Sequence, residues 1–305
     1  MTFSPAEAEA CQRLVEMAWE EDLGPQQDPF TGHAADVTSQ KLIPPDRQGQ
    51  AVFVARAAGV VAGLPALELA LSTVNTPLLK FQPLVEDGAR VQLGDRLATV
   101  TGLAQFILLA ERIALNFLQH LSGVATLTRR FVDAVAGLPC QILDTRKTIP
   151  GWRRLEKYAV RCGGGHNHRM GLYDAVLIKD SHLALLGVGK EAFQAVAAMH
   201  EGILPVPLEI EVEALEQLDW ALGWRPEIIL LDNMAPELLR EAVRRRNEKA
   251  PKVLLEASGG ITLETVRAVT ETGVDRISVG ALTHSAPALD IALDYLDCKL
   301  ESYHA

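Results

Sequence analysis

The chain has 305 residues, of which 48% are hydrophobic and 22% are charged, and its formal net charge is -10 at pH 7. This length is enough for two domains with a sizeable core, although single barrels also reach it. The acidic balance argues against nucleic-acid and membrane-surface partners, because such binding is normally driven by a basic patch. We therefore expect neither nucleic acid nor membrane among the partners.

The cysteines and the N-terminus indicate a cytoplasmic protein. The chain has four cysteines with neither a CxxC pair nor zinc-ligand spacing, so we expect reduced thiols. No basic region followed by an apolar stretch marks a signal peptide, and no apolar run is long enough to span a bilayer. Cys162 lies in a polar segment, where a catalytic thiol has to be weighed, but no base with an orienting group accompanies it in the sequence. We expect Cys162 to serve packing.

The N-terminal part of the chain predicts a helix and then a β-rich domain. Residues 5–21 carry apolar positions at helical spacing with acids between them. The next loop, 26–35, is rich in Gly, Pro and polar residues and is interpreted as a surface insertion or a lid. Between 50 and 102, short alternating runs are separated by turn signals, with a helix expected at 65–73. These runs resemble the sandwich of biotinyl and lipoyl carriers, but their turns carry no lysine, which disfavours a carrier.

Helical spacing returns after the β-rich region. Residues 104–136 have a broad apolar face and predict one long helix with a break at Gly123. Arg112 lies in this helix, where pairing with the adjacent Glu111 or a solvated position is the plain structural interpretation. Near the end of the chain, residues 286–300 also predict a helix, which would return to the N-terminal domain or contact a dimer partner.

From residue 141 onward, strand-like and helix-like segments alternate. Such alternation is typical of parallel strands joined by crossover helices, and the lack of a dinucleotide-binding fingerprint favours a barrel. The sequence therefore predicts an α/β fold, with an N-terminal α/β sandwich domain over 1–114, an α/β barrel over 115–285 and a C-terminal helix over 286–305 that packs back on the first domain. The strands are expected at 141–145, 175–179, 207–212, 227–232, 252–257 and 276–280, and the helices at 191–200, 215–222, 236–245 and 263–272.

The densest polar chemistry lies between Leu143 and His182. The cations in the helical part of this segment are explained by a solvated position. Five other cations follow strand ends or glycines, where the backbone directs side chains into a shared space. These would repel one another unless a multiply charged anion held them together. Arginine suits planar carboxylates and lysine suits phosphates, so we expect a ligand with both groups. The five are Arg146, Lys147, His168, Arg169 and Lys179.

Carboxylates accompany the later strands. In the predicted strand LEIEV, the two-residue period places Glu209 and Glu211 on one face, and Asp232 ends the next strand. A glutamate that faces a barrel interior is costly unless it meets a cation or a metal. An ion pair with Lys179 is the alternative interpretation, and both can hold.

Glycines follow the last two predicted strands. Ser258-Gly259-Gly260 and Gly280 precede helical segments, where backbone N–H groups make phosphate cradles. Ordinary turns use Gly-Gly more often, but two such turns on the strands where barrels bind phosphate strengthen the interpretation.

Two histidines beside the glycine triplet invite a metal interpretation. His166 and His168 are only two residues apart, which is not helical ligand spacing, and no cysteine or third histidine lies close by. The sequence therefore disfavours a histidine metal site.

Several segments together resemble one enzyme family. Residues 143–182, which include DTRKTIPGWRRLEKYAVRCGGGHNHR, are similar to the signature segment of the quinolinate phosphoribosyltransferase family. EDLG, DVTS, ERIALNFLQHLSGVAT, LLDNM and EASGGI are similar as well, so the resemblance covers nearly the whole chain. It implies an incomplete, six-stranded barrel and a transfer of phosphoribosyl from phosphoribosyl pyrophosphate to quinolinate. The expected products are nicotinate mononucleotide for NAD biosynthesis, pyrophosphate and CO₂, with Mg²⁺ as cofactor.

The resemblance and the charge pattern together suggest roles for single residues. The carboxylates of quinolinate would meet Arg146, His168, Arg169 and Lys179, and Arg112 would reach the site from the other subunit of a homodimer. Phosphates of phosphoribosyl pyrophosphate would meet Lys147 and Lys179, while Glu209 and Asp232 would bind Mg²⁺ and the ribose hydroxyls. The 5′-phosphate would lie on Ser258, Gly259, Gly260, Gly280 and His284. The expected catalytic residues are Lys147, Lys179, Glu209 and Asp232, and Thr145 is added to the substrate-binding set.

Two other interpretations stay open. The chain could be a paralogue that acts on another base, such as the molybdenum-transport-associated ModD-like proteins, whose sequences share DTRK and GGG-like segments. It could also be a non-catalytic barrel that binds a phosphorylated metabolite, although a sensor has no need for a pair of metal-binding carboxylates. Pyrophosphate formation separates the sensor from the transferases, and CO₂ release separates quinolinate from nicotinate as the base.

Overall fold

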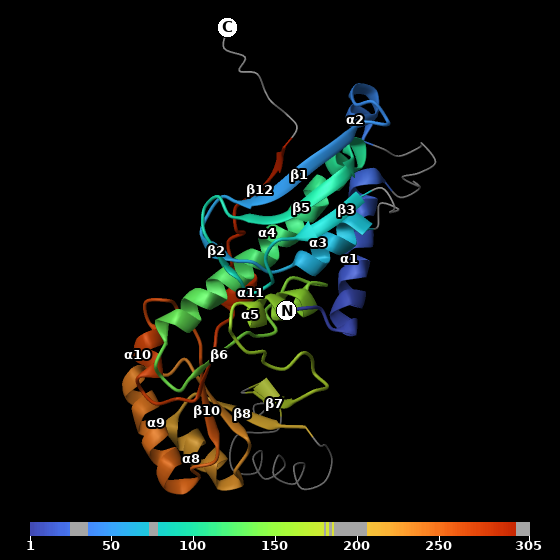
Figure 1. Ribbon diagram of the computed structural model, residues 1–305. Helices are drawn as coiled ribbons and strands as arrows, with labels where there is room; N and C mark the ends of the chain where they lie inside the picture. Colours follow the sequence, from blue (N-terminus) through green and yellow to red (C-terminus); the bar gives the residue numbers. More distant parts are fainter. Residues whose placement is uncertain (25–35, 73–78, 180, 183–184, 186–205, 297–305) are drawn as a thin grey trace. The chain divides into compact units, whose positions relative to one another are not determined.

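The computed structural model describes residues 1–24, 36–72, 79–179, 181–182, 185 and 206–296, and Figure 1 shows their course. The predicted loop at 26–35 and the predicted helix at 191–200 lie outside these residues. Two compact units are found. The first contains the described parts of Met1–Leu127, Ile149–Gly164 and Ser285–Ala305, and the second contains those of Thr128–Thr148 and Gly165–His284.

This division differs from the single boundary expected between residues 114 and 115. The segment Ile149–Gly164 belongs to the first unit because its helix α5 (Arg153–Cys162) bonds there. The Tyr158 hydroxyl donates to a carboxylate oxygen of Asp87 over 2.7 Å, and Arg161 forms an ion pair with Glu7. The periodic sequence pattern predicts that α5 is a helix, but it does not predict which sheet or helix α5 packs against.

The first unit is built on a four-stranded antiparallel sheet in the order β12-β1-β5-β3. Helices α3 and α4 lie against one face of it (Figure 1), and the second part of strand β1, from Ala51 to Ala55, is buried. Helix α1 begins at a capping box, in which the Ser4 hydroxyl and the Glu7 carboxylate each accept a backbone N–H. The elements of this unit outside α5 are α1 (Pro5–Leu23), α2 (Val37–Leu42), β1 (Gln48–Ala55), β2 (Gly59–Val60), α3 (Leu64–Ser72), β3 (Leu79–Pro83), β4 (Arg90–Val91), β5 (Arg96–Leu103), most of α4 (Ala104–Ala134) and β12 (Ile291–Tyr295).

The predicted C-terminal helix is wrong for the described residues. Ile291–Tyr295 forms strand β12, which pairs antiparallel with the edge of β1, for example Leu293 opposite Phe53. A short apolar run is ambiguous between helix and strand, and here the unpaired N–H and C=O groups of an open sheet edge decide it.

The predicted break at Gly123 is also wrong, since α4 continues through it to Ala134. A Cβ atom at this position would lie 2.2 Å from the carbonyl oxygen of Pro287. Glycine is therefore required because the backbone around Pro287 crosses the helix at this point, and the residue makes room for that crossing rather than ending the helix.

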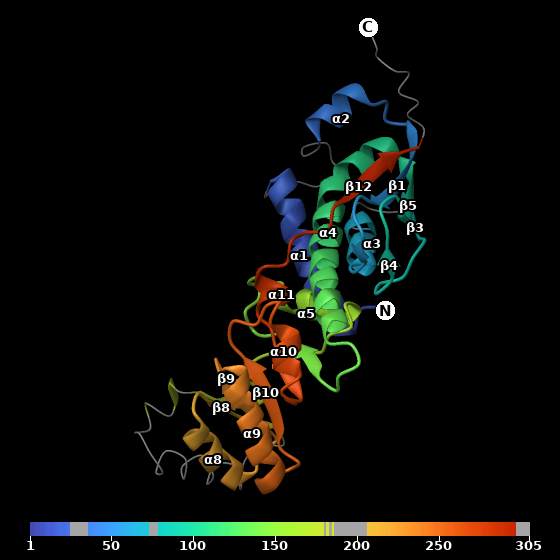
Figure 2. The same cartoon turned by 90° about the vertical axis from the view of Figure 1, so that its left-hand side faces the viewer.

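The second unit confirms the expected six parallel strands. They form a sheet in the order β6-β11-β10-β9-β8-β7, and no pairing between β6 and β7 closes it among the described residues. Neighbouring helices α8, α9 and α10 pack side by side along one face of the sheet (Figure 2). The elements are β6 (Gln141–Leu143), β7 (Val176–Ile178), β8 (Leu208–Val212), α8 (Leu215–Trp224), β9 (Ile228–Asp232), α9 (Pro236–Lys249), β10 (Leu254–Ser258), α10 (Val266–Thr270), β11 (Arg276–Ser278) and α11 (Ala281–His284).

None of the described helices is both long enough and apolar enough to cross a bilayer. The longest, α4, has 31 residues but carries charged side chains along its length, such as Glu111, Arg112 and Arg129.

Candidate active site

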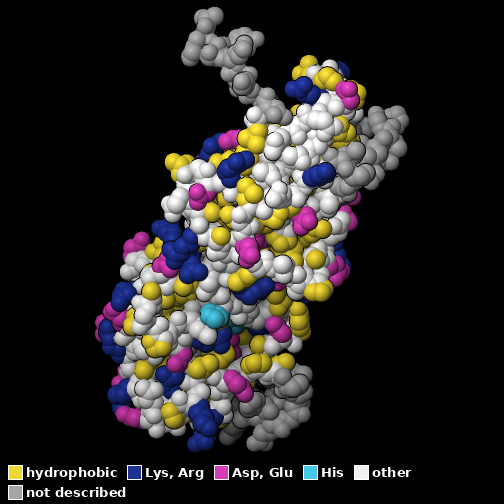
Figure 3. Space-filling view, viewed as in Figure 1, with side chains coloured by type: hydrophobic (Ala, Val, Ile, Leu, Met, Phe, Trp, Pro, Cys, Tyr) yellow, Lys and Arg dark blue, Asp and Glu magenta, His cyan; other side chains and the backbone are white. Residues whose placement is uncertain are grey.

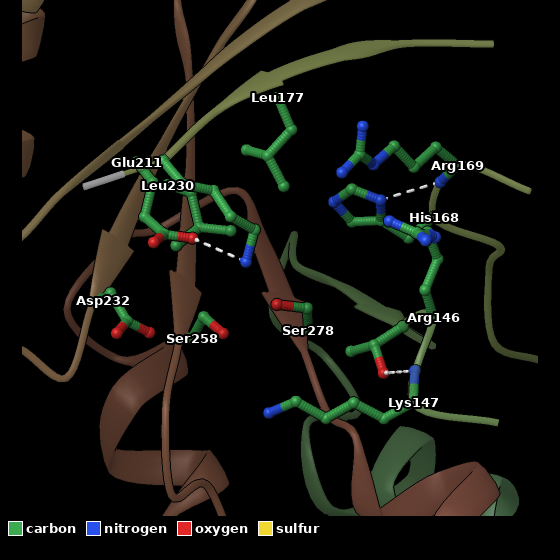
Figure 4. Close-up of a pocket in the computed structure, with 12 residues that line it drawn as sticks. Arg146, Lys147, His168, Arg169, Leu177, Glu211, Leu230, Asp232, Ser258 and Ser278 are labelled. Atoms are coloured by element: carbon green, nitrogen blue, oxygen red, sulfur yellow. Dashed lines mark hydrogen bonds and ion pairs between the residues drawn. The ribbon is translucent and has the colours of Figure 1, made fainter. Parts of the chain in front are cut away.

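A cavity of about 420 Å³ opens at the carboxyl ends of the parallel strands in the second unit. Parallel strands deliver their last residues to one edge of the sheet, so residues far apart in the sequence converge there. Figure 4 shows the side chains that point into it. The lining consists of Thr145, Arg146, Lys147, His168, Arg169, Leu177, Lys179, Glu211, Leu230, Asp232, Ser258 and Ser278.

The structure brings together all five cations singled out from the sequence. Arg146 and Lys147 come directly after β6, and the Thr283 hydroxyl donates to the backbone carbonyl of Lys147 over 2.7 Å. On the face drawn in Figure 3, by contrast, Lys and Arg are interspersed with Asp and Glu. The cationic character of the cavity is therefore a local feature of an acidic protein.

The histidine segment is held beside the end of β6. His166 forms a parallel bridge with Leu143. The buried Asp144 carboxylate accepts the Asn167 side-chain amide over 2.6 Å and the backbone N–H of His168 over 2.9 Å. The loop after the glycine triplet thus enters the cavity as an extension of the sheet, which aims His168 and Arg169 inward.

The two arginines lie close enough to affect one another. Burial lowers the pKa of Arg169, and the charge of the neighbouring Arg146 lowers it further. Figure 4 shows both arginines on the same side of the cavity as His168. Like charges held close together by the fold create a local positive field, which suits a compact anion with more than one negative group.

Carboxylates occupy the opposite side of the cavity (Figure 4). The Lys179 ammonium lies 3.6 Å from a carboxylate oxygen of Glu211, whose side chain is 12% exposed. Asp232 lies opposite Ser258 in the β9–β10 ladder and accepts the Asn233 side-chain amide over 2.7 Å. Two carboxylates that face one cavity beside lysines provide the oxygen ligands that Mg²⁺ prefers.

Glu209, to which the sequence assigned a metal- and sugar-binding role, is not among the residues that line the cavity. It is buried, and its carboxylate oxygen lies 3.0 Å from Nε2 of His168. The strand period placed Glu209 and Glu211 correctly on one face. Glu211, however, is one repeat nearer the carboxyl end of β8, and the cavity lies at that end.

His168 meets a second buried carboxylate. Its Nε2 lies 3.4 Å from an oxygen of Glu256, and its Nδ1 accepts the backbone N–H of Arg169 over 2.7 Å. Burial by itself lowers the pKa of His168, but hydrogen bonds and charge from Glu209 and Glu256 outweigh it and raise the pKa to about 9. The Arg169 N–H bonds to an unprotonated Nδ1, so full protonation of the ring breaks that bond, whereas Nε2 keeps its proton in both states.

The predicted phosphate turns have a different form from that expected. Gly259 and Gly260 both have positive φ, but α10 begins only at Val266, so the turn is not a helix N-terminus. A Cβ atom on Gly259 would lie 2.1 Å from the Asn233 side-chain oxygen, whereas one on Gly260 would meet open space. Such left-handed turns can still direct backbone N–H groups at an anion.

Gly280 lies close to the side chains of Lys147 and His284. A Cβ atom there would lie 3.1 Å from both His284 Nε2 and Lys147 Cδ. The three residues are therefore neighbours near the cavity, although Gly280 and His284 are not among its lining residues.

Some expected residues lie elsewhere, and some lining residues were missed. Arg112 belongs to the first unit and is exposed on α4. The sequence-based site omitted Leu177, Leu230 and Ser278, and it selected Glu209 rather than Glu211 from strand β8. Counting every second residue back from the end of each predicted strand could have identified Ser278 and Glu211 as cavity residues. The two leucines are apolar, so no pattern of polar residues marks them.

The fold and the cavity define an α/β barrel protein with a candidate active site lined by arginines, lysines and paired carboxylates. Comparison with known proteins is more specific. The family model described as "Quinolinate phosphoribosyl transferase, C-terminal domain" matches residues 124–294, and the corresponding N-terminal domain matches residues 36–122. The chain belongs to the quinolinate phosphoribosyltransferase family, as the resemblance of its motifs implied.

Individual relatives support this assignment along the whole chain. The nicotinate-nucleotide pyrophosphorylase [carboxylating] of Mycobacterium leprae is 45% identical over 293 residues, which cover 96% of this chain and 99% of the relative. The mitochondrial quinolinate phosphoribosyltransferase [decarboxylating] 2b of Nicotiana tabacum is 42% identical, with 86% and 78% covered. The solved nicotinate-nucleotide pyrophosphorylase of Francisella tularensis is 35% identical, covers 94% and 96%, and has a TM-score of 0.84. The expected two-domain α/β fold is confirmed.

Proposed function

We propose that this protein transfers phosphoribosyl from phosphoribosyl pyrophosphate to quinolinate with decarboxylation, as a step of de novo NAD biosynthesis. The products are nicotinate mononucleotide, pyrophosphate and CO₂. The observation that carries the proposal is the division of the cavity into a side with two arginines and a side with two carboxylates. This division suits a flat dicarboxylate beside a phosphorylated sugar.

On the quinolinate side, the guanidinium groups of Arg146 and Arg169 bind the two ring carboxylates. A planar guanidinium offers two parallel N–H donors to a carboxylate, which fixes the orientation of the ring as well as its charge. His168 lies on the same side of the cavity as the two arginines (Figure 4), with its ring held at both nitrogens. The ring nitrogen of quinolinate is thereby directed toward the sugar.

On the sugar side, charge develops as the bond between C1′ and the pyrophosphate oxygen breaks. The sugar becomes positive, and the carboxylates of Glu211 and Asp232 stabilise it. The leaving pyrophosphate becomes more negative, and Lys147 and Lys179 stabilise it. The ring nitrogen then bonds to C1′, and its positive charge lets the adjacent carboxylate leave as CO₂ while the ring carbon takes a proton.

Magnesium belongs to the same proposal. Glu211 and Asp232 fit the ion, because both face the cavity and carboxylates with substrate phosphates are its usual ligands. Bound there, the ion would neutralise negative charge on the pyrophosphate. No protein nucleophile is needed, and burial raises the pKa of the Cys162 thiol to about 12, which keeps it unreactive at neutral pH.

The test is an incubation with phosphoribosyl pyrophosphate, Mg²⁺ and either quinolinate or nicotinate, in which nicotinate mononucleotide, pyrophosphate and CO₂ are all measured. Turnover with quinolinate alone, with equal amounts of the three products, is the expected result. Pyrophosphate release only with another base would identify a paralogue of the ModD-like kind. No pyrophosphate with any base would identify a binding protein and contradict the proposal.

We also propose a homodimer in which Arg112 acts on the partner's site. Arg112 is exposed on α4, and none of the ion pairs among the described residues involves it. The adjacent Glu111, its plainest local partner, accepts the Tyr295 hydroxyl over 3.0 Å instead. A solvent-exposed arginine whose acidic neighbour bonds elsewhere is available to an anion bound by another subunit.

Mixing two inactive variants tests the shared site. Arg112→Ala and Arg146→Ala are each expected to lose most activity, because each removes one cation from every site. In a mixed dimer, one site combines an intact Arg146 with the partner's intact Arg112, so complete exchange restores about a quarter of the wild-type activity. Activity is measured after subunit exchange, with each variant mixed with itself as the control. No recovery despite exchange would refute action in trans.

Cytoplasmic location completes the proposal. It is supported by the described cysteines, Cys11, Cys140 and Cys162, which are all free thiols. Unpaired, scattered cysteines are typical of proteins in reducing compartments.

A further inference from the structure

Four charged side chains form a buried layer in the second unit, one strand repeat below the cavity. Nε2 of His168 lies 3.0 Å from Glu209 and 3.4 Å from Glu256. The other carboxylate oxygen of Glu256 lies 3.0 Å from Nε of Arg276. The side chains of both glutamates are almost wholly buried, and that of Arg276 is 14% exposed. We call these four residues the sub-site network.

Strand register explains how the network reaches the cavity. Glu256 on β10 lies opposite Arg276 on β11, and each is followed two residues later by a serine that lines the cavity, Ser258 and Ser278. The same step leads from Glu209 to Glu211 on β8. Because residues i and i+2 point to the same face of a strand, the network directly supports the polar cavity residues.

The two buried carboxylates of the sub-site network need cationic partners, and the network contains one arginine and one histidine to meet them. Two carboxylates without cations would be strongly destabilising at this depth. They would also weaken the positive field in which the arginines bind an anion. Arg276 offsets the charge of Glu256, so Glu256 can lie 3.4 Å from Nε2 of His168 without making the site more negative. His168 is the one network member that lines the cavity.

We propose that Glu256, held in place by Arg276, is a positioning residue that fixes the ring of His168 where it lines the arginine side of the cavity, and so shapes that side for quinolinate. It acts through His168 and does not touch the substrate. Glu209 fixes the Nε2 proton from one strand and Glu256 from another, so the ring cannot rotate about its bond to Cβ without breaking both contacts. This inference rests on the proposed function.

A double-mutant cycle with quinolinate as the titrated ligand tests the inference. Glu256→Gln keeps the size of the side chain and removes its charge, and we expect the Kd for quinolinate to rise about tenfold, as for a buried donor that loses its charged acceptor. In the His168→Gln background the same substitution is expected to change the Kd less than about twofold, because the group it positions is gone. The Kd for phosphoribosyl pyrophosphate is expected to stay the same throughout.

Controls separate positioning from damage to the fold. Arg246→Gln removes another buried ion pair of the same unit, with Asp275 at 2.6 Å, and is expected to leave the quinolinate Kd unchanged. Thermal unfolding is followed for each variant. If Glu256→Gln does not fold, Arg276→Lys, which keeps the charge but shifts the partner of Glu256, is expected to raise the Kd in the same His168-dependent way.

The outcomes are distinct. An equal loss of quinolinate affinity in the wild-type and His168→Gln backgrounds overturns the inference, and so does an unchanged affinity in folded Glu256→Gln. Failure of the wild-type protein to bind or convert quinolinate contradicts the proposed function instead. A loss in Glu256→Gln that disappears with His168 supports both.

Discussion

Substituting glutamine for Glu211 is expected to lower kcat/KM about 100- to 1000-fold, the effect of removing a preorganised charge from a transition state. The side chain faces the cavity and pairs with Lys179 over 3.6 Å, so it is placed to stabilise the sugar and to bind Mg²⁺. The loss should fall mainly on kcat, with a higher Mg²⁺ concentration needed for half-maximal rate. Steady-state kinetics over a range of Mg²⁺ concentrations measures both effects.

The matched control is Glu213→Gln. Glu213 follows Glu211 by one strand repeat but is exposed and lies outside the cavity lining. It is expected to keep wild-type kinetics and an unchanged Mg²⁺ dependence. Similar losses from the two substitutions would show that Glu211 acts only through the net charge of the chain, which contradicts its proposed role.

Replacing Arg146 with lysine is expected to raise the KM for quinolinate about 100-fold, although the positive charge is kept. An ammonium group cannot form the two parallel hydrogen bonds of a guanidinium, so the carboxylate loses both its second bond and its orientation. The KM for phosphoribosyl pyrophosphate is expected to change little, because the lysines bind its phosphates. Initial rates with each substrate varied in turn make the comparison.

Arg240→Lys is the control for this substitution. Arg240 lies on α9 with its side chain 54% exposed and is expected to be neutral. If Arg146→Lys raised the KM for phosphoribosyl pyrophosphate and left that for quinolinate unchanged, Arg146 would belong to the pyrophosphate side, and the assignment of the two sides of the cavity would have to be reversed.

The strands and helices of the barrel were predicted well, because the periodic patterns that reveal them arise between residues close together in the sequence. Alternating strand and helix segments placed all six parallel strands to within a few residues. Strand ends in such a fold meet at one edge, so the sequence also predicted that Arg146, Lys147 and Lys179 would converge. Neither conclusion requires knowledge of which strand pairs with which.

The choice between Glu209 and Glu211 shows where such reasoning fails. Both lie on the same face of β8, and the strand period cannot tell which one reaches the cavity. The depth of each glutamate below the cavity depends on how far β8 is shifted along its neighbours β7 and β9. That shift is a property of the assembled sheet.

The alternation of strands and helices, the cations at the strand ends and the family of the chain can all be read from the amino-acid sequence. Three features become visible only in the folded protein: Ile291–Tyr295 is a strand, Glu211 faces the cavity, and His168 meets Glu209 and Glu256, the second of which pairs with Arg276. The physical reason is the distance along the sequence between the residues that interact. Periodicity and turn signals arise between residues a few positions apart, whereas edge pairing, strand depth and buried charge pairing arise between segments that are distant in the chain.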